Sequence, residues 1–180
     1  MSFKIVPLAP NHTREDFNCG TPELDRYLRQ YASQDIRRNL AALFVAVQDE
    51  TYRVLGYYTL SNASVKRRIV PESPQKRLSK YDDVPAIRLG RLAVDRSVQG
   101  LGLGERLLAN AVIRGTSNVS AWALMIVDAK DDKACIFYKK FGFESLLDDK
   151  RHLYISRRDL EANFLRSKRS ASYQIEINGN

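Results

Sequence analysis

The amino-acid sequence predicts a single α/β domain built on a mixed central sheet, with antiparallel strands in its N-terminal half, a parallel pair at its centre and flanking helices. Two β-rich segments joined by a short polar turn indicate an antiparallel hairpin, and a later strand, helix and strand in succession imply a right-handed parallel crossover. The chain has 180 residues, of which 44% are hydrophobic. That is enough for one substantial core, and a single domain is the default at this length.

The first predicted helix begins close to residue 21. Thr21 can act as its N-cap, and Pro22 suits its first position because no backbone donor is needed there. Apolar side chains then recur at helical spacing. They predict one apolar stripe formed by Leu24, Tyr27, Leu28, Tyr31 and Ala32.

The predicted hairpin comes next along the chain. The segments "ALFVAVQ" (42–48) and "VLGYYTLSNASV" (54–65) are rich in β-branched and aromatic residues, and "DETY" forms the turn between them. The basic, proline-containing stretch 66–85 is predicted to be a loop with room for a short helix.

The second half of the chain alternates strands and helices. In order, we expect a strand over 86–95, a helix over about 102–114, a strand over 123–129, a helix over 133–141 and a last strand over 151–158. The folded domain is expected to span residues 1–166. The remaining residues, 167–180, form a polar tail whose composition is typical of disordered termini.

The formal net charge of +8 favours an anionic partner. Basic residues gather in three stretches, which are 29–38, 66–80 and 150–158, the last continuing to 166–170. A single charge run is most often a solvated face, but several in one small domain make a polyanion such as RNA a better explanation.

Several other classes of protein are disfavoured. No apolar run approaches the roughly 18–20 residues that cross a bilayer, and "MSFKIVPLAP" lacks the pattern of a signal peptide, so we expect a cytoplasmic protein with no membrane partner. Cys19 and Cys135 match no metal or redox spacing, and His12 and His152 stand alone, so no metal site is expected.

A glycine-rich turn precedes the helix predicted from residue 102. In Gln99-Gly100-Leu101-Gly102-Leu103-Gly104 the missing side chains would let a ligand approach the backbone, and the first N–H groups of the helix would attract phosphate. The segment is not a P-loop, because Glu105 and Arg106 stand where Lys and Ser/Thr are needed. A dinucleotide fingerprint would need glycine at 105. The alternative is a tight turn whose glycines serve packing alone.

Four ordered segments carry a resemblance to a known family. "RLAVDRSVQGLGLGERLL" resembles the acetyl-CoA-binding motif of the GNAT acetyltransferases, and "FNCGTPELDRYLRQYASQD", "GYYTLS" and "FYKKFGF" extend the likeness over about residues 4–160. Together they resemble the GNAT toxins of bacterial toxin–antitoxin modules. The resemblance implies a GNAT fold and transfer of the acetyl group of acetyl-CoA to the primary amine of an aminoacyl-tRNA, which stops translation.

The resemblance also implies roles for particular residues. The glycine turn would hold the pyrophosphate of acetyl-CoA, the backbone of the preceding strand would pair with its pantetheine arm, and a small residue on the next helix would leave room for that arm. These cofactor-binding residues are Leu92, Ala93, Val94, Gln99, Gly100, Leu101, Gly102, Leu103, Gly104 and Ala134. The general acid maps onto Tyr138, whose neutral hydroxyl could donate a proton to the departing thiolate.

Some assignments stay open at the level of sequence. By spacing alone Tyr138 is a partly buried helix residue, and Asp131 stands where many GNAT proteins have Asn, although a carboxylate there could still accept a hydrogen bond. No general base is visible. The candidates for holding tRNA phosphates are Arg37, Arg38, Lys76 and Arg77. The family implies a homodimer and a ribbon-helix-helix antitoxin that neutralises the toxin and with it binds operator DNA. Rival functions are acetylation of a protein or small-molecule amine and a non-catalytic basic RNA-binding domain.

Overall fold

The structure, a computed structural model, describes residues 2–78, 80–117 and 120–170. Within these ranges it forms one sheet in the order β1-β2-β3-β4-β5-β7-β6. The strands are β1 (Phe3–Pro7), β2 (Ala42–Gln48), β3 (Val54–Lys66), β4 (Asp83–Val94), β5 (Leu124–Asp128), β6 (Glu144–Ser145) and β7 (His152–Ser156). Neighbouring strands are antiparallel except β4 and β5, which are parallel. The predicted mixed sheet with a parallel central pair is therefore confirmed.

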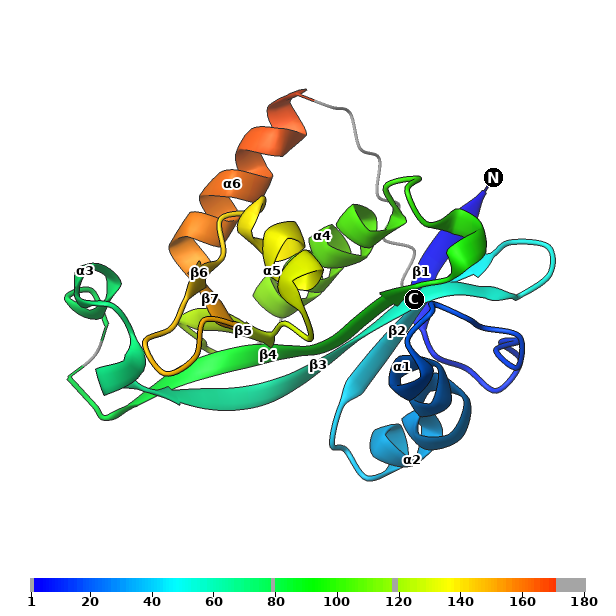
Figure 1. Ribbon diagram of the computed structural model, residues 1–180, viewed down its shortest axis with the longest axis horizontal. Coiled ribbons are helices and arrows are strands. Elements are labelled where there is room, and N and C mark those ends of the chain that lie inside the picture. Colours follow the sequence, from blue (N-terminus) through cyan, green and yellow to red (C-terminus); the bar gives the residue numbers. More distant parts are fainter. Residues whose placement is uncertain (1, 79, 118–119, 171–180) are drawn as a thin grey trace.

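Helices cover both faces of the sheet (Figure 1). On one face lie α4 (Leu103–Thr116), α5 (Asp132–Lys139) and α6 (Arg157–Ser170), and on the other lie α1 (Pro22–Arg26) and α2 (Ala32–Arg37). The short helix α3 (Glu72–Gln75) stands in the connection between β3 and β4. Among the described residues, none of the helices combines the length and apolar composition needed to cross a bilayer.

The core divides according to these two faces. Under α4 and α5, the largest buried cluster includes Leu107, Met125 and Leu153, all with no exposed surface. Under α1 and α2, a second cluster is built around Leu28 and Tyr57. A third cluster includes Val65 of β3 and Leu124 and Ile126 of β5. It lies on the same face of the sheet as the second cluster, because side chains alternate along β3 and Val65 therefore points to the same side as Tyr57.

The first helix differs from the predicted single apolar stripe. A π-helical turn over Tyr27–Tyr31 separates α1 from α2. A π turn adds a residue to the turn and rotates the phase of the helix, so Tyr31 is 47% exposed although Leu28 and Ala32 are fully buried. Thr21 does occupy the N-cap position, but its side chain makes no capping hydrogen bond and instead accepts one from Lys130.

Other boundaries also depart from expectation. β4 begins at Asp83, earlier than predicted, because the hairpin pairing with β3 extends to Lys66 and Asp83. β1 and α6 were not predicted, and β7 ends at Ser156 because α6 begins at the next residue. Residues 167–170 of the predicted tail belong to α6, and residues 171–180 lie outside the described residues. The division of the chain at 166 stays a prediction.

Candidate active site

A gap opens between β4 and β5 partway along the sheet. The two strands pair only from Ala86↔Leu124 to Arg88↔Ile126. Just beyond this pairing, Thr59 of β3 pairs with Arg91 of β4, and Leu60 of β3 pairs with Leu89 of β4. Gly90 is therefore an unpaired bulge residue in β4. Bulges bend strands. From here to Val94, β4 keeps β3 on one side and has no strand partner on the other among the described residues.

The register of β4 determines which backbone groups face this gap. The N–H of Asp95 donates to the carbonyl of Leu55 at 2.9 Å, which makes this a hydrogen-bonded pair. Alternation along the antiparallel ladder then directs the backbone groups of Ala93 toward β3 and those of Leu92 and Val94 toward the gap. Of the three predicted pantetheine-contacting residues, two therefore present their backbone to the gap.

The glycine turn forms an open concave backbone at the end of β4. Gly100 has φ 77° and Gly102 has φ 79°, values that side-chain-bearing residues rarely adopt. A Cβ added at either position would meet no protein atom within 4 Å. The glycines are therefore not explained by packing within the chain, and they keep the space above the turn clear.

Helix α4 starts directly from this turn, with Gly102 as its N-cap. The N–H groups of its first turn have no partner within the helix, and the positive end of its dipole points the same way, so the turn suits an anion. Gly104 differs from the other two glycines, because a Cβ there would lie 3.6 Å from the Phe137 ring and 3.8 Å from Val94. Of the flanking leucines, Leu101 is 72% exposed and Leu103 is buried.

Gln99 ties the turn to the rest of the fold. Its side-chain amide donates to the carbonyl oxygens of Val94 and Cys19, both at 2.9 Å. The predicted anion-binding residue thus holds its own turn against the end of β4 and the N-terminal segment.

Tyr138 lies on α5 and is 6% exposed. Its ring contacts those of Phe137 and Phe143, with centroids 5.1 and 5.5 Å away. Among the described residues its hydroxyl has no hydrogen-bond partner. Burial raises the pKa of Tyr138 above its usual value, so the phenol stays neutral at physiological pH.

The structure gives Asp131 a clear role. It is the N-cap of α5, and its carboxylate accepts the N–H of Ala134 at 2.8 Å. This hydrogen bond lowers the pKa of Asp131. Asp131 therefore fixes the start of the helix that carries Ala134 and Tyr138, as an Asn at the same position could.

The four tRNA candidates are exposed but stand in two separate places. Arg37 is the last residue of α2 and Arg38 its C-cap, whereas Lys76 is the C-cap of α3 and Arg77 follows it. In Figure 1, α2 lies on one face of the sheet and α3 lies at the far end of the β3–β4 hairpin. The structure does not bring the two pairs into one cluster.

The expectation that His152 stands alone is wrong. Its Nδ1 lies 3.0 Å from a carboxylate oxygen of Asp148, and its Nε2 lies 3.8 Å from one of Asp128. Asp148 lies only four residues before His152, which was an available signal, whereas Asp128 comes from the distant strand β5. His12 is buried and accepts the N–H of Ala9. Within the described ranges no group of three or more His, Cys, Asp or Glu side chains could hold a metal ion.

A family model described as an acetyltransferase (GNAT) domain matches residues 39–145, more than half of the chain. The chain belongs to the GNAT acetyltransferase family. This GNAT chain is 37% identical over 148 residues to a tRNA-acetylating toxin of Mycobacterium tuberculosis (strain ATCC 25618 / H37Rv), and the match covers 81% of this chain and 87% of the relative. The predicted family and fold class are confirmed.

Solved structures of GNAT toxins also match. AtaT complexed with acetyl-methionyl-tRNAfMet has a TM-score of 0.82 at 30% identity, covering 91% of this chain and 99% of that chain. A tyrosine-to-phenylalanine mutant of AtaT, bound to the C-terminus of the antitoxin AtaR and acetyl-CoA, has a TM-score of 0.76 at 26% identity, covering 90% and 98%. The AtaT–AtaR complex with bound DNA has a TM-score of 0.71 at 27% identity, covering 89% and 99%.

Proposed function

We propose that this GNAT protein transfers the acetyl group of acetyl-CoA to the primary amine of aminoacyl-tRNA and thereby acts as a translation-blocking toxin. The observation that carries the proposal is the gap between β4 and β5 with an anion-suited glycine turn at the end of β4. The buried, neutral phenol of Tyr138 lies on α5, the helix that follows β5, and supports it. The likeness to a tRNA-acetylating toxin, and to AtaT complexed with an acetylated aminoacyl-tRNA, supports this choice of acceptor.

The residues of the gap fit acetyl-CoA. A side chain at Gly100 or Gly102 would occupy the open space above the turn, where the pyrophosphate would bind backbone N–H groups. The pantetheine arm contains two amides, and the backbone groups of Leu92 and the N–H of Val94, which face the gap, could pair with them as with an added strand; the Val94 carbonyl already accepts the Gln99 amide. Gln99, Leu101, Leu103, Gly104, Ala93 and Ala134 complete the proposed donor-binding set.

Tyr138 is the proposed catalytic acid. Bound acetyl-CoA supplies a thioester whose carbonyl carbon is attacked by the amine nitrogen, so a C–N bond forms as the C–S bond breaks. The hydroxyl of Tyr138 donates its proton to the leaving sulfur. Burial raises the pKa of this phenol, so the proton is present at neutral pH.

The acceptor is recognised partly through its charge. With a net charge of +8 and exposed basic pairs at the ends of α2 and α3, the protein would attract the phosphates of tRNA. We propose Arg37, Arg38, Lys76 and Arg77 as phosphate contacts. Because the Arg37–Arg38 pair and the Lys76–Arg77 pair stand apart, either the two pairs contact different parts of one tRNA or only one of them contacts the tRNA.

The proposed biological setting is a toxin–antitoxin module. We propose that the protein acts in the cytoplasm as a homodimer, and that a ribbon-helix-helix antitoxin neutralises it and with it binds operator DNA. The likeness to AtaT bound to AtaR, and to that complex with bound DNA, supports this proposal.

One assay tests the proposed function. The protein is incubated with acetyl-CoA and bulk charged tRNA, and the aminoacyl ends are identified by mass spectrometry. We expect N-acetylated aminoacyl ends. Acetylation of a polyamine or a protein amine, with charged tRNA left unmodified, would replace the proposed acceptor, and binding of tRNA with no acetyl transfer to any amine would favour a non-catalytic RNA-binding protein.

A further inference from the structure

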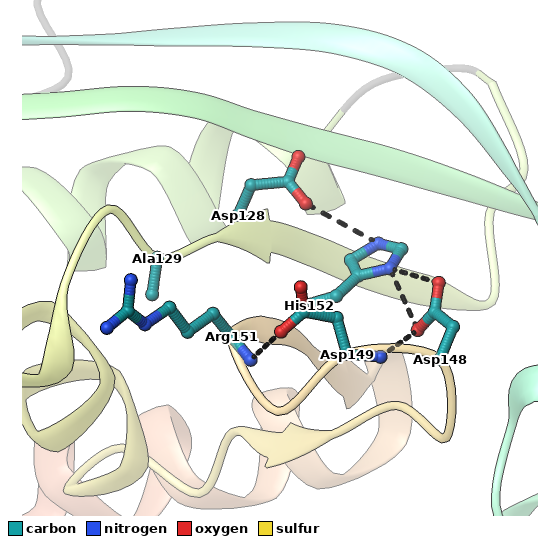
Figure 2. Close-up of a pocket in the computed structure, with 6 residues that line it drawn as sticks. All are labelled: Asp128, Ala129, Asp148, Asp149, Arg151 and His152. Atoms are coloured by element: carbon teal, nitrogen blue, oxygen red, sulfur yellow. Dashed lines mark hydrogen bonds and ion pairs between the residues drawn. The ribbon is translucent and has the colours of Figure 1, made fainter.

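A cavity of about 340 Å³ lies at the C-terminal end of β5 (Figure 2). Six residues line it, which are Asp128, Ala129, Asp148, Asp149, Arg151 and His152. Asp128 and His152 are direct partners in the register between β5 and β7, so their side chains share one face of the sheet. Alternation along β5 places Asp128 on the face of Ile126, which is the face opposite the helix that carries Tyr138.

The His152 ring lies between two carboxylates, as Figure 2 shows. Its Nδ1 lies 3.0 and 3.2 Å from the two oxygens of Asp148, and its side chain is 17% exposed. Its Nε2 is enclosed, has no hydrogen-bond partner among the described residues, and lies 3.8 Å from Asp128, whose side chain is 59% exposed. Asp148 thus orients the ring, and Asp128 links it to solvent.

This arrangement is poised to accept a proton. If Nδ1–H donates to Asp148, the neutral ring presents the lone pair of Nε2 to the carboxylate of Asp128, and the two repel unless a proton lies between them. Burial opposes ionisation of Asp148, but its hydrogen bond with His152, the charge of a protonated His152 ring and the nearby backbone N–H groups together lower the pKa of Asp148. The Asp148 carboxylate therefore stays charged and can stabilise a protonated His152 ring.

The cluster also stands where the gap opens. An oxygen of Asp128 lies 3.6 Å from a guanidinium nitrogen of Arg88, and Arg88 belongs to the last residue pair before β4 and β5 separate. Ala129, the next residue along β5, belongs to the same buried cluster as Tyr138. A thioester held in the gap would thus have the phenol on one face and the Asp128 carboxylate on the other.

The charges around the cavity suit a cation. The charged groups that face His152 or its partners are Asp128 of β5, Asp148, Asp149 and Arg151 of the segment before β7, Arg88 of β4 and Asp132 of α5. Arg151 is paired with Asp132 at 3.1 Å, and Arg88 contacts Asp128 only at 3.6 Å. The Asp149 carboxylate accepts the backbone N–H of Arg151, so the negative charge available to an ammonium group lies on Asp128 and Asp148 beside the ring.

We propose that Asp128 binds the α-ammonium of the acceptor and passes one of its protons to His152, which Asp148 holds in position. This inference rests on the proposed acetyl transfer. The ammonium nitrogen loses one proton through Asp128 to Nε2 of His152, which later releases it to water. The neutral amine then attacks the thioester carbon, the sulfur leaves with the proton of Tyr138, and the second proton lost by nitrogen returns to Tyr138 through water. One proton is released per turnover.

The test compares three variants with a matched control. Asp128→Asn, His152→Gln and Asp148→Asn each remove one member of the relay. Asp149→Asn removes an equal charge from the same cavity, but the Asp149 side chain bonds to the backbone of Arg151 rather than to the ring. Initial rates are measured with acetyl-CoA and bulk charged tRNA from pH 6.5 to 9, and calorimetry with acetyl-CoA verifies that each variant folds and binds the donor.

We expect kcat of His152→Gln to fall by about 10²-fold near pH 6.5, within the range of acid–base catalysis. An α-amine ionises near pH 8, so at pH 9 it is deprotonated without help and the defect should shrink toward unity. Asp128→Asn should also raise KM for charged tRNA without changing acetyl-CoA affinity. Asp149→Asn should stay within about twofold of the unmodified protein, because it lies outside the relay.

Two results would overturn the inference. The first is a rate defect that is equal at pH 6.5 and pH 9, which would mark the cluster as a structural support for the loop before β7. The second is an unchanged kcat in both His152→Gln and Asp128→Asn; if one of the two fails to fold, the other alone decides. If the unmodified protein acetylates a simple primary amine but not charged tRNA, the proposed acceptor fails, and the same variants are judged on that amine.

Discussion

The carboxylate of Asp95 accepts the backbone N–H of Asn18 at 2.9 Å, although the two residues are 77 positions apart. Asp95 is 3% exposed and immediately follows β4. It also accepts hydrogen bonds from the backbone N–H and the hydroxyl of Ser97, and it forms an ion pair with Arg53. A single buried carboxylate therefore joins the N-terminal segment to the chain that leads into the glycine turn.

Asp95 should make the stability of the protein depend on pH. Burial opposes its ionisation, but hydrogen bonds from Ser97 and Asn18 outweigh this and lower its pKa below the unfolded value. A depressed pKa stabilises the fold above the unfolded value, near 4, and the contribution is lost as pH falls toward the folded value. Asp95→Asn should thus cost roughly 2 kcal/mol of unfolding free energy at pH 7 and much less at pH 3.

Urea unfolding at the two pH values measures this effect. The matched control is Asp83→Asn, because Asp83 is paired with Lys66 on the surface with both side chains 55% exposed. Such pairs contribute little. Equal losses for the two variants would contradict the role given to Asp95.

The glycine turn makes a second prediction. Gly102→Asn should weaken acetyl-CoA binding, because the new side chain enters the open space above the turn. Asparagine tolerates positive φ better than other residues, and Asn39 already adopts φ 56° in this chain, so the strain should cost only about 1 kcal/mol. Calorimetry measures the affinity of the variant for acetyl-CoA, once cooperative thermal unfolding has shown that the variant is folded. An unchanged affinity would show that the glycine turn does not bind acetyl-CoA.

Tyr138→Phe should separate catalysis from packing. Because the hydroxyl of Tyr138 has no hydrogen-bond partner among the described residues, its removal should leave stability and acetyl-CoA binding nearly unchanged. Turnover should fall by about 10²- to 10⁴-fold if the phenol is the acid. We expect the variant to be harmless when expressed.

The control for this prediction is Tyr58→Phe, in the same buried cluster. The Tyr58 hydroxyl donates to Asn110 at 2.6 Å, so this variant should lose about 1 kcal/mol of stability and keep its turnover. A Tyr138→Phe protein that acetylates charged tRNA at the original rate would exclude Tyr138 as the acid.

The basic pairs make a prediction about salt. Reversing Arg37 and Arg38 to Glu, or Lys76 and Arg77 to Glu, should weaken tRNA binding and lower the salt dependence of log Kd by roughly 1 to 2 per pair of lost phosphate contacts. Acetyl-CoA affinity should not change, since both pairs lie away from the glycine turn. Filter binding at several salt concentrations measures the slope, and a flat response in the unmodified protein would argue against a tRNA acceptor.

The N-cap of α5 can be tested by two substitutions. Asp131→Ala should cost about 1 kcal/mol of stability, because the N–H of Ala134 loses its acceptor. Asp131→Asn should retain most of this stability, since an amide oxygen can also cap. Thermal unfolding of both variants distinguishes a capping role from a role of the charge itself.

Local sequence patterns predicted those parts of the fold that depend on local periodicity. The hairpin, the crossover and α4 were found because β-branched runs and helical spacing carry their own signal. Tyr31 was misplaced because nothing in the spacing indicates a π turn. The helix α6 was missed because its sequence, "RRDLEANFLRSKRS", is mostly polar and charged.

The site divides in the same way. The glycine turn and Tyr138 were found because they occur in short contiguous motifs. The contact between Asp128 and His152 was not predicted, because it depends on the register between β5 and β7, and local sequence patterns do not determine which residues of two strands pair. The separation of the two tRNA candidate pairs could not be predicted either, because the distance between α2 and α3 depends on how the β3–β4 hairpin folds.

The three-residue junction between β4 and β5 affects how the molecule reaches its native state. The β3–β4 hairpin needs only a local closure, but β5 can join β4 only after the chain has passed through the whole of α4. Contacts between residues distant in sequence form slowly, because a long loop must close before they are made. A nascent chain should therefore acquire the gap proposed to bind acetyl-CoA late, so that a partially synthesised protein should be inert toward the charged tRNA that the ribosome uses.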